Sequence, residues 1–256
     1  LDHLTLADVQ ALHREQYVAG NAVLAVVAPM PVNESTGVVT ATFGALPAQQ
    51  PPADPEPTPL PADSAVEVTG STDLAQASMV VGVPLAGPSD PDYLVGELLA
   101  QVLDGPSGRL RRDVALLQAL GLVIPSRLLA EHYPVQVLPL PLTRHPYLAV
   151  HVLCSPTTIE RTRRGVLRHL LAFRSGSASD NELELARKRV INQHALAHLR
   201  PVDAALQLAQ REAFGLPLLS DQEFAAAVAA ITKEDLTSFA NRHFTRHAIG
   251  LQMPES

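Results

Sequence analysis

The sequence is poor in cysteine, aromatic residues and long apolar runs, and each scarcity excludes a class of protein. Its 256 residues include one cysteine, Cys154, which excludes an intrachain disulfide framework and a cysteine-rich zinc site. Aromatic residues make up 4% and tryptophan is absent, so we expect a core of leucine, valine and alanine. No apolar run approaches the roughly 18 residues of a membrane span. A net charge of −7 argues against a nucleic-acid partner, which favours a basic surface.

The start of the chain lacks an initiator methionine, a charged leader and an apolar leader segment. It opens on Leu1, so we expect a processed product or a piece of a longer protein. No targeting segment is visible, and the compartment stays open between cytoplasm and periplasm. With 46% apolar and 18% charged residues, the chain can bury a sizeable core, which excludes a wholly disordered protein.

A proline-rich stretch divides the chain into unequal parts. Seven prolines fall between Ala45 and Ala65, and proline fixes φ and removes a backbone donor. We therefore predict a linker over residues 47–65. It separates a short leading part, 1–46, from a body of residues 66–256.

Hydrophobic periodicity and turn residues predict an α+β fold, with strands first and a long helical run after them. We expect a mainly antiparallel sheet with helices packed on one face. Prolines between Pro134 and Pro146 predict a long irregular loop there. The predicted strands are Ala22–Ala28, Val66–Thr69, Ala75–Val83, Leu122–Ala130, Tyr147–Cys154 and Ala248–Met253. The predicted helices are Leu6–Gly20, Asn33–Phe43, Asp90–Leu103, Gly108–Leu120, Thr157–Phe173, Asp180–Leu199, Val202–Phe214, Gln222–Ala230 and a last helix that is capped by Thr232.

An internal repeat links the two ends of the sequence. The segment Leu4–Leu12 matches Ile231–Phe239 in its threonine cap, its aspartate three residues later and its apolar spacing. Tyr17 and Phe244 share the same offset of 227 residues, and a short apolar segment follows each. The repeat predicts one complete copy of a duplicated domain preceded by the tail of another.

These motifs together resemble the pitrilysin-type zinc metallopeptidase family, in its bacterial branch similar to the mitochondrial processing peptidase. The resemblance rests on the order of the two Thr-x-x-Asp helices and of several short motifs between them. Those motifs are Asp90-Pro91-Asp92-Tyr93, Leu103-Asp104-Gly105, Gly108-Arg109-Leu110, Gly121-Leu122, Asp180–Arg187 and Gly215-Leu216-Pro217. The resemblance implies two homologous α+β domains joined by a linker, with residues 66–256 as the C-terminal domain and 1–46 as the tail of the N-terminal one.

Departures from the family pattern favour a non-catalytic chain. Active members carry His-x-x-Glu-His on a helix, which supplies two zinc ligands and the glutamate that activates water. This sequence has no such motif. Where active relatives present an arginine and a tyrosine to the substrate, alignment places Leu117 and Ile124, which cannot donate a hydrogen bond. The resemblance thus implies a zinc endopeptidase family, yet this chain alone is expected to be inactive.

Three residues of the shortened glycine turn are candidates for contact with a substrate: Gly105, Ser107 and Arg109. For Arg109 the alternative is simple placement at a helix start. Arg161, Arg164 and Arg168 form a basic stripe, which we interpret as a solvated helix face rather than a docking site for an acidic partner.

Two histidine pairs have the spacing of metal ligands. His194 and His198 lie one helical turn apart, but Ala195 stands where a metallopeptidase has its general base, and no cysteine is near. His243 and His247 share the spacing but straddle a helix end and a strand start. We therefore expect no metal and no catalytic residue in this chain, and zinc only in a partner domain or subunit.

Three functions stay open at this point. The first is the non-catalytic part of a peptidase that closes a peptide-binding chamber with a zinc-bearing domain or partner subunit. The second is an assembly or scaffold subunit that binds no peptide, and the third is an independent metal enzyme. Expected partners are a zinc-bearing homologue, a peptide or a second copy in a homodimer, without nucleic acid or membrane. The peptide substrate and the oligomeric state are not determined by the sequence.

Overall fold

The computed structural model describes residues 4–46, 48–53, 65–73, 75–104, 108–110, 112, 135–140 and 146–255. The chain groups into two compact units. The larger unit comprises Pro59–Ala195 and Leu219–Ser256, and the smaller comprises Leu1–Thr58 and Leu196–Leu218. No helix within the described ranges combines the length and apolarity needed to cross a membrane.

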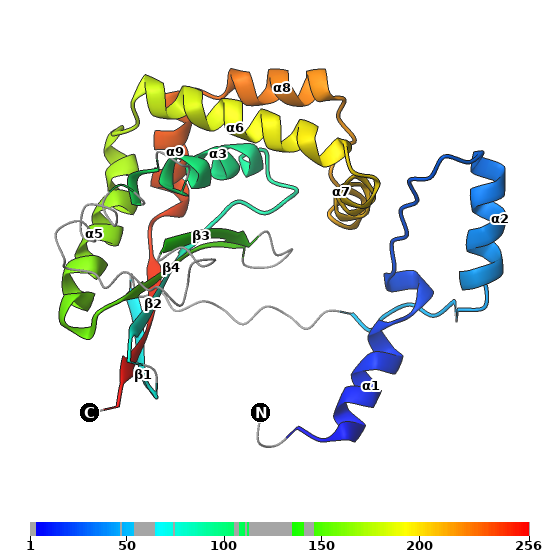
Figure 1. Cartoon of the computed structure of the whole chain (residues 1–256), viewed down its shortest axis with the longest axis horizontal. Coiled ribbons are helices and arrows are strands. Elements are labelled where there is room, and N and C mark those ends of the chain that lie inside the picture. Colours follow the sequence, from blue (N-terminus) through cyan, green and yellow to red (C-terminus); the bar gives the residue numbers. More distant parts are fainter. Residues whose placement is uncertain are drawn as a thin grey trace. The chain divides into compact units, whose positions relative to one another are not determined.

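The larger unit is built on a sheet of five described strands in the order β1-β5-β2-β4-β3 (Figure 1). The strands are β1 (Ala65–Thr72), β2 (Ala77–Pro84), β3 (Val135–Leu140), β4 (Tyr147–Cys154) and β5 (His247–Pro254). Only β1 and β5 run parallel, and the other three pairings are antiparallel. The expectation of an α+β fold is confirmed, with a mixed sheet that is mostly antiparallel.

Helices from three stretches of the sequence accompany this sheet (Figure 1). They are α3 (Tyr93–Asp104), α5 (Ile159–Ala172), α6 (Asp180–His198), α8 (Asp221–Ala230) and α9 (Lys233–His243). Helix α5 contacts β2 and β4, while α3 contacts β3 and α9. Single 3₁₀ turns flank α5, at Pro156–Thr158 and Phe173–Ser175.

The core lies between one face of the sheet and these helices. Along β2, Met79 and Val81 are fully buried, whereas Val80, which points to the other face, is 39% exposed. Aromatic residues are scarce in the sequence, but most of the phenylalanines lie in this core. Four of the six are buried, namely Phe173, Phe224, Phe239 and Phe244. A few large rings therefore fill the space between aliphatic side chains.

A glycine lets α3 and α9 approach each other closely. A Cβ at Gly96 of α3 would lie 2.9 Å from Leu85 Cδ1 and 3.1 Å from Phe239 Cζ. Real Cβ atoms rarely show such distances, so a larger residue at this position would force the side chains of Leu85 and Phe239 to shift. This contact fixes the position of the helix that leads into β5.

Two elements differ from the sequence-based predictions. Residues Val135–Leu140, predicted as an irregular loop, form β3, which is the last strand on one side of the sheet among the described residues. Pro139 is compatible with that position, because an edge strand need not donate every backbone hydrogen bond. Residues 22–28, predicted as a strand, have no strand conformation. A strand needs a hydrogen-bonding neighbour, and no described strand pairs with this segment.

The predicted strand Leu122–Ala130 and nearly all of the predicted helix Gly108–Leu120 lie outside the described residues. The remaining predicted helices and strands are present, with bounds that differ by a few residues. Strand β4 has the predicted bounds, and α9 begins after the predicted cap, Thr232.

The smaller unit contains three described α-helices, α1 (Leu6–Gln16), α2 (Val32–Phe43) and α7 (Pro201–Ala213). None of these helices contains a buried residue. Val18, which follows α1, is buried at 3% exposure. The helices of this unit thus leave most of their apolar side chains exposed.

We expect Leu236→Ala and Leu12→Ala to differ sharply in their effect on stability. Leu236 in α9 is fully buried and Leu12 in α1 is 58% exposed, although both helices start with the same capping motif. Removing the buried side chain should lower the free energy of unfolding by about 2–5 kcal/mol, and removing the exposed one by less than about 0.5 kcal/mol. Urea unfolding measures both, and equal losses would contradict the described core.

Candidate functional site

Arg109 lies in the first turn of a helical segment and is almost completely buried, at 9% exposure. Its Nε and Nη2 donate hydrogen bonds to Glu182 Oε1 and Oε2, each at 2.8 Å. Nη1 donates to Ser177 Oγ at 2.7 Å, and Nη2 also donates to the Ser177 carbonyl at 2.5 Å. The guanidinium stacks over the Phe173 ring, 4.7 Å from its centroid. This is a bidentate ion pair with the planar cation held on an aromatic face.

Glu182, the acceptor of this pair, is also part of the start of α6. The Ser179 backbone N–H and hydroxyl donate to Glu182 Oε2 at 3.0 and 2.8 Å, and the Glu182 N–H donates back to Ser179 Oγ. This is a capping box in which the glutamate has an additional partner. The hydrogen bonds from Arg109, followed by those from Ser179, lower the Glu182 pKa to about 2 despite the opposing effect of burial.

Of the three residues predicted to face a substrate, the structure describes only Arg109. Gly105 and Ser107 lie outside the described residues. Arg109 is described, and Glu182 and Ser177 occupy most of its donors. Its surroundings are those of a structural ion pair between the start of α6 and the helical segment that contains Arg109, and contact with a substrate stays a prediction. Leu117 and Ile124 also lie outside the described residues.

His194 is the second buried polar residue of interest, at 8% exposure. It lies on α6 and its ring stacks on Phe224 of α8, with centroids 3.8 Å apart and planes 11° apart. Its Nε2 lies 3.4 Å from Asp221 Oδ1, at the first residue of α8. The imidazole thus has a defined plane and a carboxylate beside one of its nitrogens.

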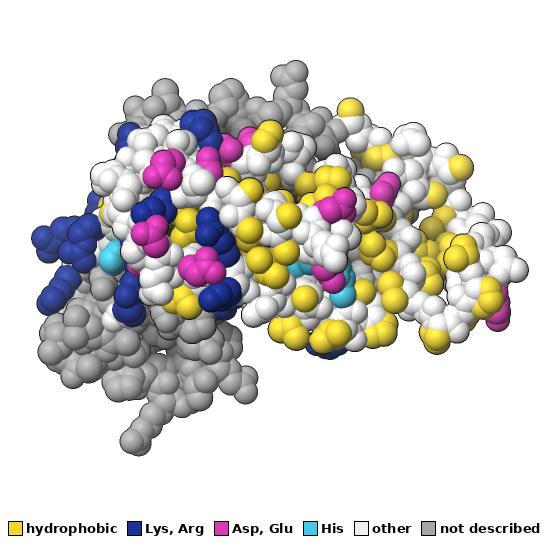
Figure 2. Space-filling view, turned by 90° about the horizontal axis from the view of Figure 1, so that it is seen from above, with side chains coloured by type: hydrophobic (Ala, Val, Ile, Leu, Met, Phe, Trp, Pro, Cys, Tyr) yellow, Lys and Arg dark blue, Asp and Glu magenta, His cyan; other side chains and the backbone are white. Residues whose placement is uncertain are grey.

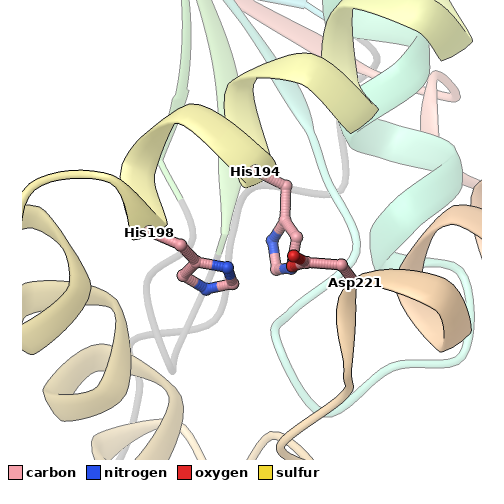
Figure 3. Close-up of side chains that lie close together, drawn as sticks. All are labelled: His194, His198 and Asp221. Carbon is pink, nitrogen blue, oxygen red and sulfur yellow. The ribbon is translucent and has the colours of Figure 1, made fainter.

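His198 and Asp221 lie beside His194 (Figure 3). One potential ligand atom from each of the three residues lies within 4.8 Å of the other two. The sequence showed the metal-ligand spacing of the two histidines, although we expected no metal there, and it gave no sign of Asp221, which is 23 positions after His198. No local spacing pattern connects Asp221 with the pair, because tertiary packing of α8 on α6 creates that contact.

The other histidine pair has no such arrangement. His243 is the last residue of α9 and His247 the first of β5, as predicted. His243 Nε2 lies 3.6 Å from Asp92 Oδ2, an oxygen that also accepts from Arg242. The Asp92 carboxylate is therefore already engaged by a guanidinium.

A shallow pocket lies where α6 and α9 begin, and it carries charges of both signs. Lys233 Nζ and Asp180 Oδ1 form an ion pair at 2.7 Å, and Arg187 Nη1 lies 3.3 Å from Glu184 Oε2. Figure 2 shows basic and acidic side chains alternating on one face. Alternating charge is typical of a solvated surface, so this pocket has no strong preference for a cation or an anion.

Comparison with known proteins gives the class of the chain. The sequence profile of the family described as the peptidase M16 inactive domain matches residues 3–190. This match covers more than half of the chain, so the chain belongs to that family. The resemblance to pitrilysin-type metallopeptidases is confirmed, and the matching part of that family is its inactive domain.

Solved structures show the same fold. A peptidase M16 inactive domain from Pseudomonas fluorescens matches 99% of this chain, with a TM-score of 0.79 and 22% identity. A protease from Helicobacter pylori also matches 99%, with a TM-score of 0.76 and 17% identity. A chain of complex III2 from Candida albicans matches 98%, with a TM-score of 0.70 and 14% identity. The match spans only about three fifths of each of those chains, 59%, 60% and 60%. No curated protein matches the sequence.

We expect Glu182→Gln to remove part of the acid sensitivity of this fold. A carboxylate whose folded pKa is depressed contributes stability above its ordinary pKa near 4.5, and that contribution is lost as the pH falls towards about 2. The variant should be about 2 kcal/mol less stable at neutral pH, with a shallower loss of stability between pH 4.5 and 2. Urea unfolding at a series of pH values tests this.

Glu184→Gln is the matched control, because Glu184 lies on the same helix with 51% of its side chain exposed. It should change the stability by less than about 0.5 kcal/mol. A Glu182→Gln variant with the stability and pH profile of this control would contradict the role of the ion pair.

Proposed function

We propose that this chain is the non-catalytic, C-terminal part of a pitrilysin-type zinc metalloendopeptidase-like protein. It closes a peptide-binding chamber together with a zinc-bearing domain or partner subunit. The observation that carries the proposal is the match to the peptidase M16 inactive domain in a sequence without His-x-x-Glu-His. A chain of this class supplies the chamber wall, while the ligands and general base of hydrolysis come from elsewhere.

The two ends of the chain support a duplicated domain. Helix α1 begins with a capping box between Thr5 and Asp8, and α9 begins with one between Thr232 and Asp235. In each, the aspartate carboxylate accepts from the threonine N–H at 2.8 Å. Each helix also ends on an aromatic residue whose N–H donates to the carbonyl four positions earlier. The local conformation of the repeat is therefore the same at its start and at its end.

The apolar face of α9 is buried and that of α1 is exposed, which indicates that α1 lacks an element to cover it. Leu236, Phe239 and Phe244 are at most 2% exposed. The residues at the same offsets in α1, Val9, Leu12 and Tyr17, are 56%, 58% and 72% exposed. An apolar helix face of this kind costs free energy in water unless another element covers it. We propose that a homologous zinc-bearing domain covers α1 in the way that the core covers α9.

The segment after α1 supports the same proposal. Strand β5 follows α9 and pairs with β1 and β2. The apolar residues 22–28 follow α1 without any described pairing, and Val23 and Leu24 are 43% and 52% exposed. In the proposed complex this segment is a strand in the sheet of the homologous domain, where its backbone groups are hydrogen-bonded.

An assembly subunit without peptide binding is the second candidate. The similarity to a chain of complex III2 from Candida albicans favours it, because that chain is part of a multisubunit assembly. The two candidates differ in one measurable property, since only the chamber function requires the complex with a zinc-bearing partner to bind a peptide.

We expect the purified chain to hydrolyse no peptide, with or without added zinc. Metal-dependent hydrolysis needs about three ligands, an open position for water and a general base, and Ala195 stands where a base would follow His194. A fluorogenic peptide library, assayed before and after dialysis against a chelator, measures this activity. Turnover that copurifies with the chain through successive columns would contradict the proposal.

We also expect the isolated chain to self-associate through the exposed face of α1. Sedimentation velocity should show a rising average mass with concentration, and Leu12→Asp should return the chain to monomers because a charge on that face opposes burial. Gln10→Asp is the matched control on the same helix, where an exposed polar residue is replaced, and it should leave the association unchanged. A wild-type chain that stays monomeric at all concentrations, or equal effects of both variants, would argue against this face as an interface.

A further inference from the structure

We propose that His194, His198 and Asp221 bind one divalent transition-metal ion of the zinc and cobalt class. The three residues lie beyond 3–190, the part of the chain that matches the family profile. The proposal does not rest on the proposed function. The sequence by itself led to the opposite expectation, because two imidazoles without a third ligand do not make a stable site.

The distance between two of the ligand atoms already suits a metal. Tetrahedral zinc with bonds of about 2.0–2.1 Å holds neighbouring ligand atoms about 3.3 Å apart. His194 Nε2 and Asp221 Oδ1 are 3.4 Å apart. An ion can occupy a point between these two atoms without moving either helix.

Packing holds His194 in place for this role. The ring is 8% exposed and stacks face to face on Phe224, which restricts its rotation. A ligand whose rotamer is fixed by its neighbours loses little conformational freedom on binding. The neutral imidazole is also the form that coordinates zinc, and its edge next to Asp221 is the one that would do so.

Helix capping holds Asp221 in place. Ser220 Oγ accepts a hydrogen bond from the Glu223 N–H at 3.3 Å, and the Glu223 carboxylate accepts from the Ser220 N–H at 2.8 Å. This capping box fixes the first turn of α8, in which Asp221 is the first residue. The Glu223 carboxylate is engaged in the cap, whereas the Asp221 carboxylate lies beside His194.

His198 completes the set with little rearrangement. It lies one turn after His194 on the same helix, and that spacing places both imidazoles on one side of α6 (Figure 3). All three ligand atoms lie within 4.8 Å of one another. His198 and Asp221 are exposed, so a change of side-chain rotamer can shorten the longer distances. Two nitrogens and one oxygen suit zinc, cobalt or nickel better than calcium or magnesium.

The site as proposed is not hydrolytic. Water would fill the fourth position, but the three described ligands include no additional base, and Ala195 cannot act as one. The ion would instead join the end of α6 to the start of α8, and so link the two ends of the segment 199–220, which contains α7. Closing a loop of this kind restricts the unfolded chain, as other cross-links do.

Cobalt binding to the tag-free, full-length chain tests the proposal directly. We expect one Co²⁺ per chain with a visible absorption band typical of four or five ligands, and displacement of that band by equimolar Zn²⁺. His198→Ala and Asp221→Asn should each weaken Co²⁺ binding at least tenfold. Both residues are exposed, so circular dichroism and thermal melting of the metal-free variants should match the wild type.

His247→Ala is the control, because it removes a histidine of the second pair and leaves the proposed site intact. It should bind Co²⁺ as the wild type does. His194→Ala also removes the ring that packs on Phe224, so the proposal is judged on the two exposed ligands. The absence of saturable Co²⁺ binding, or binding that His198→Ala and Asp221→Asn leave unchanged, would overturn it.

Discussion

The larger unit depends on the close packing of α9 against the sheet and α3. The Phe239 ring lies so near to Gly96 that a Cβ there would be 3.1 Å from Phe239 Cζ, and Leu236 and Phe244 of the same segment are also buried. Because α9 leads directly into β5, this contact also brings the last strand between β1 and β2. A chain with few aromatic residues thus uses large rings where a helix must be anchored, and aliphatic side chains elsewhere.

The same capped helix occurs in two environments, and the difference between them carries the functional argument. A capping box is a local interaction over three residues, so it forms in α1 and α9 alike. Burial of the apolar face depends on what surrounds the helix, and only α9 has such surroundings within the described chain. The exposed face of α1 is therefore the best indication that this chain works with another domain or subunit.

The two buried polar residues Arg109 and His194 have different surroundings, which favour different roles. Arg109 is neutralised by Glu182 and donates further hydrogen bonds to Ser177, so its charge helps to connect its own helical segment to the start of α6. His194 is held by an aromatic ring and lies beside a carboxylate, with a second histidine one turn away. Burial next to a fully paired counter-ion favours a structural role, whereas burial next to exposed ligands of the right chemistry favours a binding site.

The sequence by itself determined the features that depend on neighbouring residues. Capping motifs, apolar periodicity and proline positions located β4, α9 and most of the other described helices, and the order of motifs identified the family. Tertiary structure alone decided the strand state of Val135–Leu140, which exists because β4 offers its edge, and the lack of a strand at 22–28, where no described strand pairs with it. It also decided the ion pair of Arg109 with Glu182 and the place of Asp221 beside His194. Those partners are separated by 73 and 27 positions, and chain folding, not local pattern, brings them within contact distance.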